Sequence, residues 1–143
     1  MIGLALVGGT RTAHEDVLKG LDKVEGYTFL HIDNNVTGMD ESVRYGRLNR
    51  ILRHRVRSFE IVIISGITTA EELTLCRELG LLAALLPGTL PRFLLNGSMA
   101  IDKKWLYLSP RPHLLAKHKQ RVFMSPLEAV SEVIIRNRRG HHA

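Results

Sequence analysis

Four short polar or glycine-containing stretches each follow an apolar run and carry groups that bind anions. They are Gly8-Gly9-Thr10-Arg11, Asp33-Asn34-Asn35, Ser65-Gly66-Ile67-Thr68 and Pro87-Gly88-Thr89. Backbone N–H groups at glycine loops and helix starts bind phosphates, and arginine grips a phosphate or carboxylate through two parallel hydrogen bonds. We therefore predict binding of a nucleotide or other phosphorylated ligand. The predicted ligand-binding residues are Gly8, Gly9, Thr10, Arg11, Asp33, Ser65, Gly66, Thr68, Gly88 and Thr89.

The first of these stretches is the best candidate for contact with a ligand. Gly8-Gly9 allows a close approach, Thr10 offers a hydroxyl and Arg11 a cation. The stretch is neither a P-loop, which needs a following Gly-Lys-Ser/Thr, nor a full Gly-x-Gly-x-x-Gly fingerprint, so NAD is not indicated and no cofactor is predicted. The alternative of equal weight is that the two glycines only permit a tight turn between a strand and a helix.

Other candidate residues leave catalysis open. Asp33 suits a ribose hydroxyl, a catalytic base or a loop cap, and His31 shares its face on a regular strand, where a core histidine is the favoured interpretation. Cys76 lies among apolar residues of an expected helix and is predicted to be a core thiol. The chain has no zinc-ligand spacing and no Gly-x-Ser-x-Gly elbow, so no metal is predicted. Without a convincing base–nucleophile pair, no catalytic residue is assigned.

The net charge of +6, from 20 Lys plus Arg against 14 Asp plus Glu, is concentrated in blocks. On the helix expected after Asp40, four arginines lie opposite the apolar stripe. A second basic stretch, from Lys103 to Arg121, contains Trp105, Tyr107, His113 and His118, which suit either stacking on bases or packing at the sheet edge. The predicted nucleic-acid or partner residues are Arg47, Arg50, Arg53, Arg57, Lys103, Lys104, Arg111, Lys117, Lys119 and Arg121. Solvated basic faces are the plain alternative.

Apolar runs alternate with helix-start signals along the whole chain. The expected strands are Ile2–Val7, Tyr27–Asp33, Glu60–Ile64, Leu81–Leu86 and Arg121–Met124. Capping boxes, in which a hydroxyl and a carboxylate exchange hydrogen bonds with the helix start, are expected at Thr12–Glu15, Thr69–Glu72 and Ser125–Glu128. Asp40 is expected to cap a helix to about Arg57, Thr89–Leu95 to be a short helical segment, and Gly80 to end the third helix.

This alternation predicts an α/β fold, in which a doubly wound, mainly parallel five-stranded sheet forms one Rossmann-like or flavodoxin-like domain over residues 1–143. The default strand order is 2-1-3-4-5. Residues 98–120 are expected to form a hairpin or irregular excursion, and the basic tail 138–143 to fray after a helix ending near Asn137. The single cysteine and the lack of an apolar span or secretory signal predict a cytoplasmic protein with no membrane partner.

Several of these motifs resemble a bacterial family known as domain of unknown function 2325, which is Rossmann-like. They are Val7-Gly8-Gly9, Phe29-Leu30-His31-Ile32-Asp33, Cys76-Arg77-Glu78-Leu79-Gly80 and the stretch from Leu86 to Phe93. The resemblance covers about residues 2–95 and leaves the basic remainder unmatched. The family tends to have histidine where this chain has Ile32, and Ser-His where it has Ile67-Thr68-Thr69, so no metal or catalytic role carries over.

Three functions follow as hypotheses. The first is a small intracellular domain that binds a phosphorylated ligand at the strand ends. The second is a nucleic-acid-binding or assembly protein that uses the arginine helix and the basic C-terminal third. The third is a homo-oligomeric scaffold component, and self-association through an edge strand or helix is compatible with all three.

Overall fold

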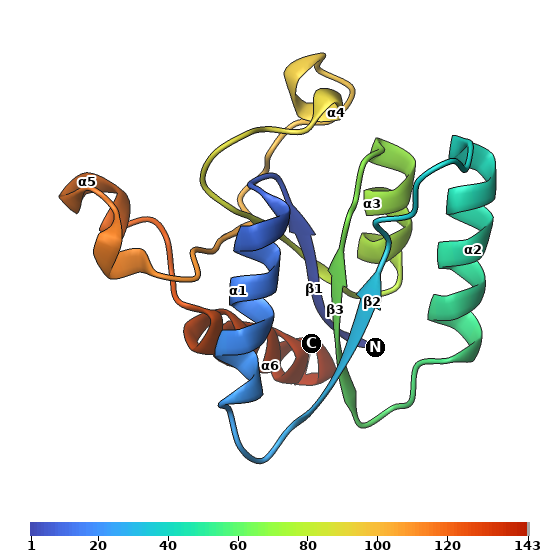
Figure 1. Cartoon of the computed structure of the whole chain (residues 1–143). Helices are drawn as coiled ribbons and strands as arrows, with labels where there is room; N and C mark the ends of the chain where they lie inside the picture. Colours follow the sequence, from blue (N-terminus) through green and yellow to red (C-terminus); the bar gives the residue numbers. More distant parts are fainter. Residues whose placement is uncertain (143) are drawn as a thin grey trace.

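A five-stranded sheet forms the centre of the protein, and its strands are all parallel (Figure 1). The computed structural model describes residues 1–142. The expected α/β doubly wound class is confirmed, since helices pack on both faces of the sheet. The strands, in the spatial order β2-β3-β1-β4-β5, are β1 (Ile2–Val7), β2 (Thr28–Asp33), β3 (Glu60–Ser65), β4 (Leu82–Leu85) and β5 (Leu106–Tyr107).

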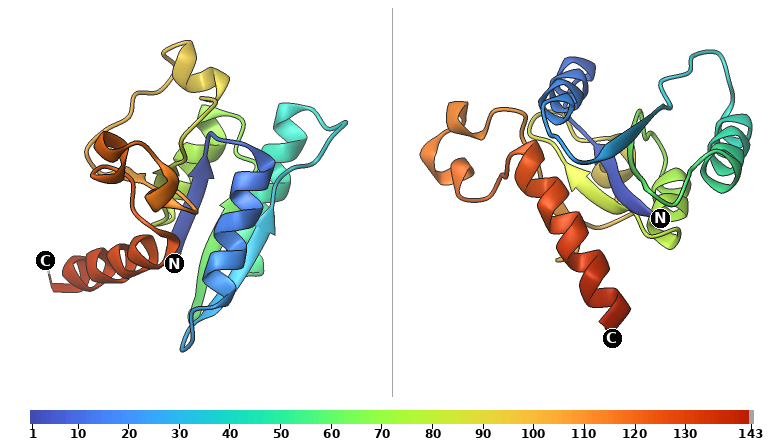
Figure 2. Two further views of the ribbon diagram at one scale, coloured as in Figure 1. Left: turned by 60° about the vertical axis from the view of Figure 1, so that its left-hand side comes forward. Right: turned by 90° about the horizontal axis from the view of Figure 1, so that it is seen from below.

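Helices α1 and α6 cover one face of the sheet, and α2 and α3 cover the other, which the view from below in Figure 2 shows. The short elements α4, η1 and α5 connect β4, β5 and α6. The helices are α1 (Arg11–Asp22), α2 (Glu41–His54), α3 (Ala70–Glu78), α4 (Arg92–Leu95), the 3₁₀ helix η1 (Pro112–Leu114), α5 (Lys117–Gln120) and α6 (Pro126–His142).

The inner strands separate two apolar layers. On the α1 and α6 side, Leu4, Leu6 and Ile63 pack against Val17 and Val130. The opposite layer joins alternate strand residues to the inner faces of α2 and α3, and Cys76, Phe93 and Trp105 belong to it. β1 and β3 are buried on both faces, as their unbroken apolar sequence predicts.

The predicted order of the central strands is wrong. β3, instead of β1, lies beside β2, and β1 lies between β3 and β4. Because β1 and β3 are both apolar along nearly their whole length, hydrophobic pattern does not rank one as more central than the other. In either order these two strands are neighbours, and their carboxyl ends meet at one edge of the sheet.

The predicted fifth strand is also misplaced. β5 is Leu106–Tyr107, parallel to β4, and of the expected segment Arg121–Met124 only Met124 joins the sheet, through one bridge to Leu108. Burial explains the choice, because Leu106 and Leu108 are 2% and 0% exposed whereas Val122 is 51% exposed. The expected excursion over 98–120 is therefore interrupted by a sheet strand and is not a hairpin.

The helix starts agree with the sequence at three of four positions. Asp40 caps α2, and full capping boxes form at Thr69–Glu72 and Ser125–Glu128. At α1, Thr10 is the cap, because its hydroxyl accepts from the Ala13 N–H at 3.1 Å, so the predicted box at Thr12–Glu15 is wrong. Gly80, with φ of +101°, follows the end of α3 as expected.

The C-terminal helix is longer than predicted. α6 continues past Asn137 to His142, so residues 138–142 of the expected frayed tail are helical and Ala143 lies outside the described residues. None of the helices within residues 1–142 combines the length and the apolar character that crossing a bilayer demands.

Candidate functional site

A hollow of about 200 Å³ opens at the carboxyl edge of the sheet, where β1, β3 and β4 end. It lies where α1 leaves β1 on one face and α3 leaves β3 on the other, which is the usual ligand position in open α/β sheets. Most of the predicted ligand-binding residues meet there, whereas Asp33, Ser65 and Gly88 lie outside its wall. The hollow is lined by Gly8, Gly9, Thr10, Arg11, His14, Asn35, Gly66, Ile67, Thr68, Thr89, Leu90 and Pro91.

The first turn of α1 borders this hollow and is electropositive. Thr10 satisfies the Ala13 N–H, but the N–H groups of Arg11 and Thr12 have no acceptor within the helix, as at any helix start. The first turn has no acidic side chain to compensate the helix dipole. The exposed Arg11 lines the hollow, and its Nε lies 3.7 Å from Glu15 Oε1.

The glycines of the hollow are required by their positive φ angles and by the close approach of neighbouring backbone atoms. Gly8 and Gly9 have φ of +73° and +74°, and a Cβ on Gly8 would lie 3.0 Å from the Thr89 carbonyl oxygen. A Cβ on Gly66 would lie 2.6 Å from the Asn35 nitrogen. The close packing of three loops therefore accounts for these glycines, and evidence for a ligand comes from the other lining groups.

A polar cluster lies between the first turn of α1 and the ends of β2 and β3. His14 Nε2 donates to the Gly8 carbonyl at 2.7 Å, and burial lowers the pKa of His14. His31 Nε2 and Ser65 Oγ are 2.9 Å apart. His31 is exposed on the edge strand, so the interpretation of it as a core histidine is wrong.

Asp33 lies at the end of β2, and Asn35 joins it to the hollow. The Asn35 backbone N–H and side-chain amide both donate to Asp33 Oδ1 at 2.9 Å, and the backbone bond is the main reason that the pKa of Asp33 is lowered. Asn35 itself lines the hollow. The carboxylate therefore stays ionised close to the ligand position and orients an amide that faces it.

Beneath the hollow, a buried ion pair joins the loops that follow β2 and β3. Arg44 Nε lies 3.4 Å from Glu72 Oε2, and the Arg44 guanidinium donates to the carbonyls of Val36 and Gly66 at 2.8 and 2.9 Å. Asn34 donates to the same carboxylate at 3.1 Å. Sequence reasoning did not single out Arg44, because its local pattern does not distinguish it from the exposed arginines of the same helix.

The predicted nucleic-acid or partner residues fall into two separate groups. Arg50 and Arg53 are exposed on α2, and Arg47 is half-buried with Nη1 3.5 Å from the Asp33 carbonyl oxygen. The helix ends at His54 and not near Arg57 as predicted, so the exposed Arg57 lies in the turn before β3. The second group is exposed in the segment that precedes α6. Figures 1 and 2 show α2 and α5 on opposite sides of the molecule, and Lys104 lines a hollow beside α3, so these residues form no single surface. The second group is Lys103, Lys104, Arg111, Lys117, Lys119 and Arg121.

Two aromatic residues of that basic stretch pack at the sheet edge. Trp105 is 3% exposed with the Arg77 guanidinium 6.0 Å from its ring, and Tyr107 meets Phe123 edge to face. Of the two interpretations of Trp105, packing is therefore the one confirmed. Cys76 is the expected core thiol, and burial raises its pKa to about 12.

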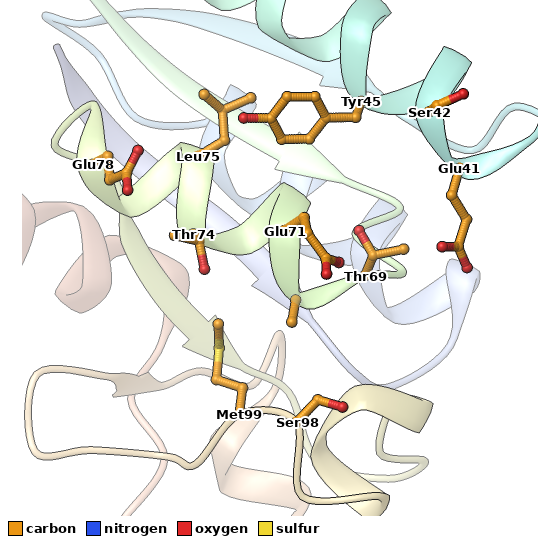
Figure 3. Close-up of a pocket in the computed structure, with 11 residues that line it drawn as sticks. Glu41, Ser42, Tyr45, Thr69, Glu71, Thr74, Leu75, Glu78, Ser98 and Met99 are labelled. Atoms are coloured by element: carbon orange, nitrogen blue, oxygen red, sulfur yellow. The ribbon is translucent and has the colours of Figure 1, made fainter.

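A larger hollow, about 510 Å³, is a groove between α2 and α3 that the sequence did not indicate (Figure 3). We call it the acidic groove because three glutamates from two helices line it. Ala70 and Met99 supply apolar surface, and Tyr45 of α2 extends towards the buried Leu75 of α3. Its charged and hydroxyl residues are Glu41, Ser42, Tyr45, Thr69, Glu71, Thr74, Glu78 and Ser98.

Comparisons of this chain with protein-family models, with curated proteins and with solved structures find no match. The resemblance to the domain of unknown function 2325 family therefore stays a prediction.

Proposed function

We propose that this protein binds a nucleotide or another phosphorylated ligand in the hollow at the carboxyl edge of its sheet. The observation that carries the proposal is the meeting of the first turn of α1 with the β1, β3 and β4 loops around one space. These loops are far apart in the sequence, and the parallel order of β3, β1 and β4 brings them together.

The chemistry of the wall suits a phosphate group. The exposed N–H groups at the start of α1 favour an anion, and Arg11 adds a cation with two parallel donors. Thr10 and Thr68 supply hydroxyls. Asp33, held ionised by Asn35, lies beside this wall and suits a neutral hydroxyl-bearing group such as a ribose.

A thermal-shift series with a panel of nucleotides and sugar phosphates tests this proposal. A ligand that binds only the folded state raises the melting temperature, and the shift grows with the logarithm of the ligand concentration once that exceeds the Kd. Arg11→Ala should remove most of that shift, and Lys19→Ala, an exposed cation at the far end of α1, should retain it. The absence of stabilisation by every compound, or equal shifts for both variants, would contradict the proposal.

A second function, binding of nucleic acid, is supported by the exposed arginines of α2 and of the turn that follows it. Arg50 and Arg57 form no ion pair in the described part of the chain. Binding of this kind weakens steeply with salt, because each neutralised phosphate releases counterions. Labelled RNA and DNA should bind at low salt, and Arg50→Ala with Arg57→Ala should reduce the salt slope by about 2. Failure of both nucleic acids to bind at low salt would exclude this function.

A further inference from the structure

The acidic groove has charge that this chain does not neutralise within its own fold. Glu41, Glu71 and Glu78 form no ion pair among the described residues. Two adjoining hollows bring cations to its margins: Arg92 shares one with Glu41 and Glu71, and Arg77 and Lys104 share the other with Glu78. Arg77 is paired with Asp102 at 2.7 Å, so among the described residues the three glutamates outnumber the two remaining cations. Partly exposed Ala70 and Met99, with the ring of Tyr45, give the groove apolar surface. A fitting occupant therefore combines several cations with exposed apolar side chains.

A segment of this same chain has that composition. Residues 110–123, which we call the arm, connect the β5 region to α6 and contain η1 and α5. Leu114 and Val122 are 67% and 51% exposed. The arm carries no acidic residue, and Lys117 and Lys119 are exposed and unpaired in the described structure. Its basic residues are Arg111, Lys117, Lys119 and Arg121.

The arm is held together largely by its own contacts. The Gln120 side chain donates to the carbonyls of His113 and Leu115 at 3.2 and 2.7 Å. The charged contact from the arm to the main body, between Arg111 and Asp16, is 4.0 Å long. The exposed leucine and valine therefore project from the molecule on a structured support.

The arm and the groove cannot meet within one molecule. Figures 1 and 2 show α5 projecting on one side of the sheet and α2 with α3 on the opposite side. Complementary surfaces on opposite sides of one molecule suit association between copies, in which each copy uses a different patch from its neighbour. We propose that the acidic groove of one copy binds the arm of a second copy, so that the chains associate head to tail.

The first test is the mass of the unmodified chain by analytical ultracentrifugation. At about 0.1 M salt the weight-average mass should rise with protein concentration to at least twice the chain mass of 16.1 kDa. At about 1 M salt, where exposed charges are screened beyond about 3 Å, it should return towards one chain mass. A constant mass of 16.1 kDa at every concentration in low salt would overturn the proposal.

Charge reversal identifies the two surfaces. Glu71→Lys with Glu78→Lys should abolish association through the groove, and Lys117→Glu with Lys119→Glu should abolish it through the arm. Matched controls with the same net charge are Asp22→Lys with Glu25→Lys, and Lys19→Glu with Lys23→Glu. Both controls should associate like the unmodified chain. Equal effects of a control and its test variant would show that net charge alone acts, which overturns the proposal.

Mixing the two reversed variants is the decisive step. Each variant retains one original surface and presents one reversed surface, so an equal mixture should associate although neither variant does alone. Circular dichroism spectra and melting curves show that each variant is folded. A mixture that stays at one chain mass with both variants folded would overturn the proposal. So would RNA binding by the arm while the unmodified chain stays monomeric.

Discussion

Glu72 is fully buried, and its two carboxylate oxygens have different partners. One oxygen accepts from the N–H groups of Thr68 and Thr69, which completes the capping box of α3. The other accepts from Asn34 and lies beside the Arg44 guanidinium. A buried carboxylate is tolerated only when it is paired and hydrogen-bonded. The same side chain therefore starts a helix and joins the loops on either side of it.

Arg44→Ala should destabilise the fold strongly. The substitution leaves the Glu72 carboxylate buried without its cation and removes the donors to the Val36 and Gly66 carbonyls, and breaking such a pair costs about 3–5 kcal/mol. Arg50→Ala, on the exposed side of the same helix, should change the free energy of unfolding by less than about 0.5 kcal/mol. Urea denaturation measures both, and similar losses would contradict a buried ion pair at Arg44.

His14 should make stability depend on pH near neutrality. Burial lowers its folded-state pKa below the ordinary value of 6.5, so below that pH the unfolded chain takes up a proton that the folded chain resists. The free energy of unfolding should therefore hold above pH 6.5 and fall as the pH drops towards the lowered pKa. His14→Gln, which keeps a donor for the Gly8 carbonyl, should flatten this slope in urea denaturation at several pH values.

The control for that slope is His118→Gln, a change at an exposed histidine of the arm. This variant should keep the full pH dependence of the unmodified protein. If the slope persisted in His14→Gln and vanished in His118→Gln, the assignment to the buried ring would be wrong.

At the scale of elements, helix caps and strand burial decide where segments begin. Thr10 and Thr12 are both hydroxyl residues at the start of α1, and the pattern Thr-x-x-Glu favoured Thr12. In the structure Gly9 donates its N–H to the Thr89 carbonyl at 2.8 Å, which places Thr10 directly after the turn with extended backbone angles suited to a cap. The cap therefore lies two residues before the one that the local pattern predicts, at a position set by a contact with a distant loop.

Substitution of the two threonines tests that boundary. Thr10→Ala should cost about 1 kcal/mol, the usual loss when a helix loses its capping hydroxyl. Thr12→Ala should be neutral or slightly stabilising, because alanine is the better helix former inside the first turn. Chemical denaturation measures the free energy of unfolding of both variants. A larger loss for Thr12→Ala than for Thr10→Ala would instead support a capping box at Thr12–Glu15.

At the scale of the whole molecule, the late part of the chain completes the core on both faces of the sheet. Trp105 joins the layer beneath α2 and α3, whereas Leu106 and Leu108 join the layer beneath α1 and α6. α6 packs beside α1 on that second face. The basic C-terminal third is thus an integral part of the fold, and its charged residues are the exposed side of segments whose other side is buried.

The position of the edge strand has a measurable consequence for stability. Leu108→Ala removes a side chain that is 0% exposed and should cost about 2–5 kcal/mol. Val122→Ala, in the segment where the sequence predicted the fifth strand, should change the free energy of unfolding by less than about 0.5 kcal/mol. Equilibrium unfolding in urea measures both changes. A larger loss of unfolding free energy for Val122→Ala than for Leu108→Ala would support an edge strand at 121–124 instead.

Local signals in the sequence determined the positions of most strands and helix starts in this protein. Apolar runs and turn residues located β1, β3 and β4, and capping residues located the starts of α2, α3 and α6, because these features depend on neighbours only a few residues apart. Most of the candidate ligand-binding residues were also found from sequence. The carboxyl ends of parallel strands meet at one edge of a sheet whatever the order of its inner strands.

Only the tertiary structure decided the features that depend on distant partners. The order of β1 and β3, the choice of Leu106–Tyr107 as edge strand, and the pairing of Arg44 with Glu72 each join residues that local pattern treats separately. His31 and Arg44 show why. Their types do not reveal burial, which is set by the neighbours that the fold brings to them. The separation of the arm from the acidic groove was likewise decided by the path of the chain around the sheet.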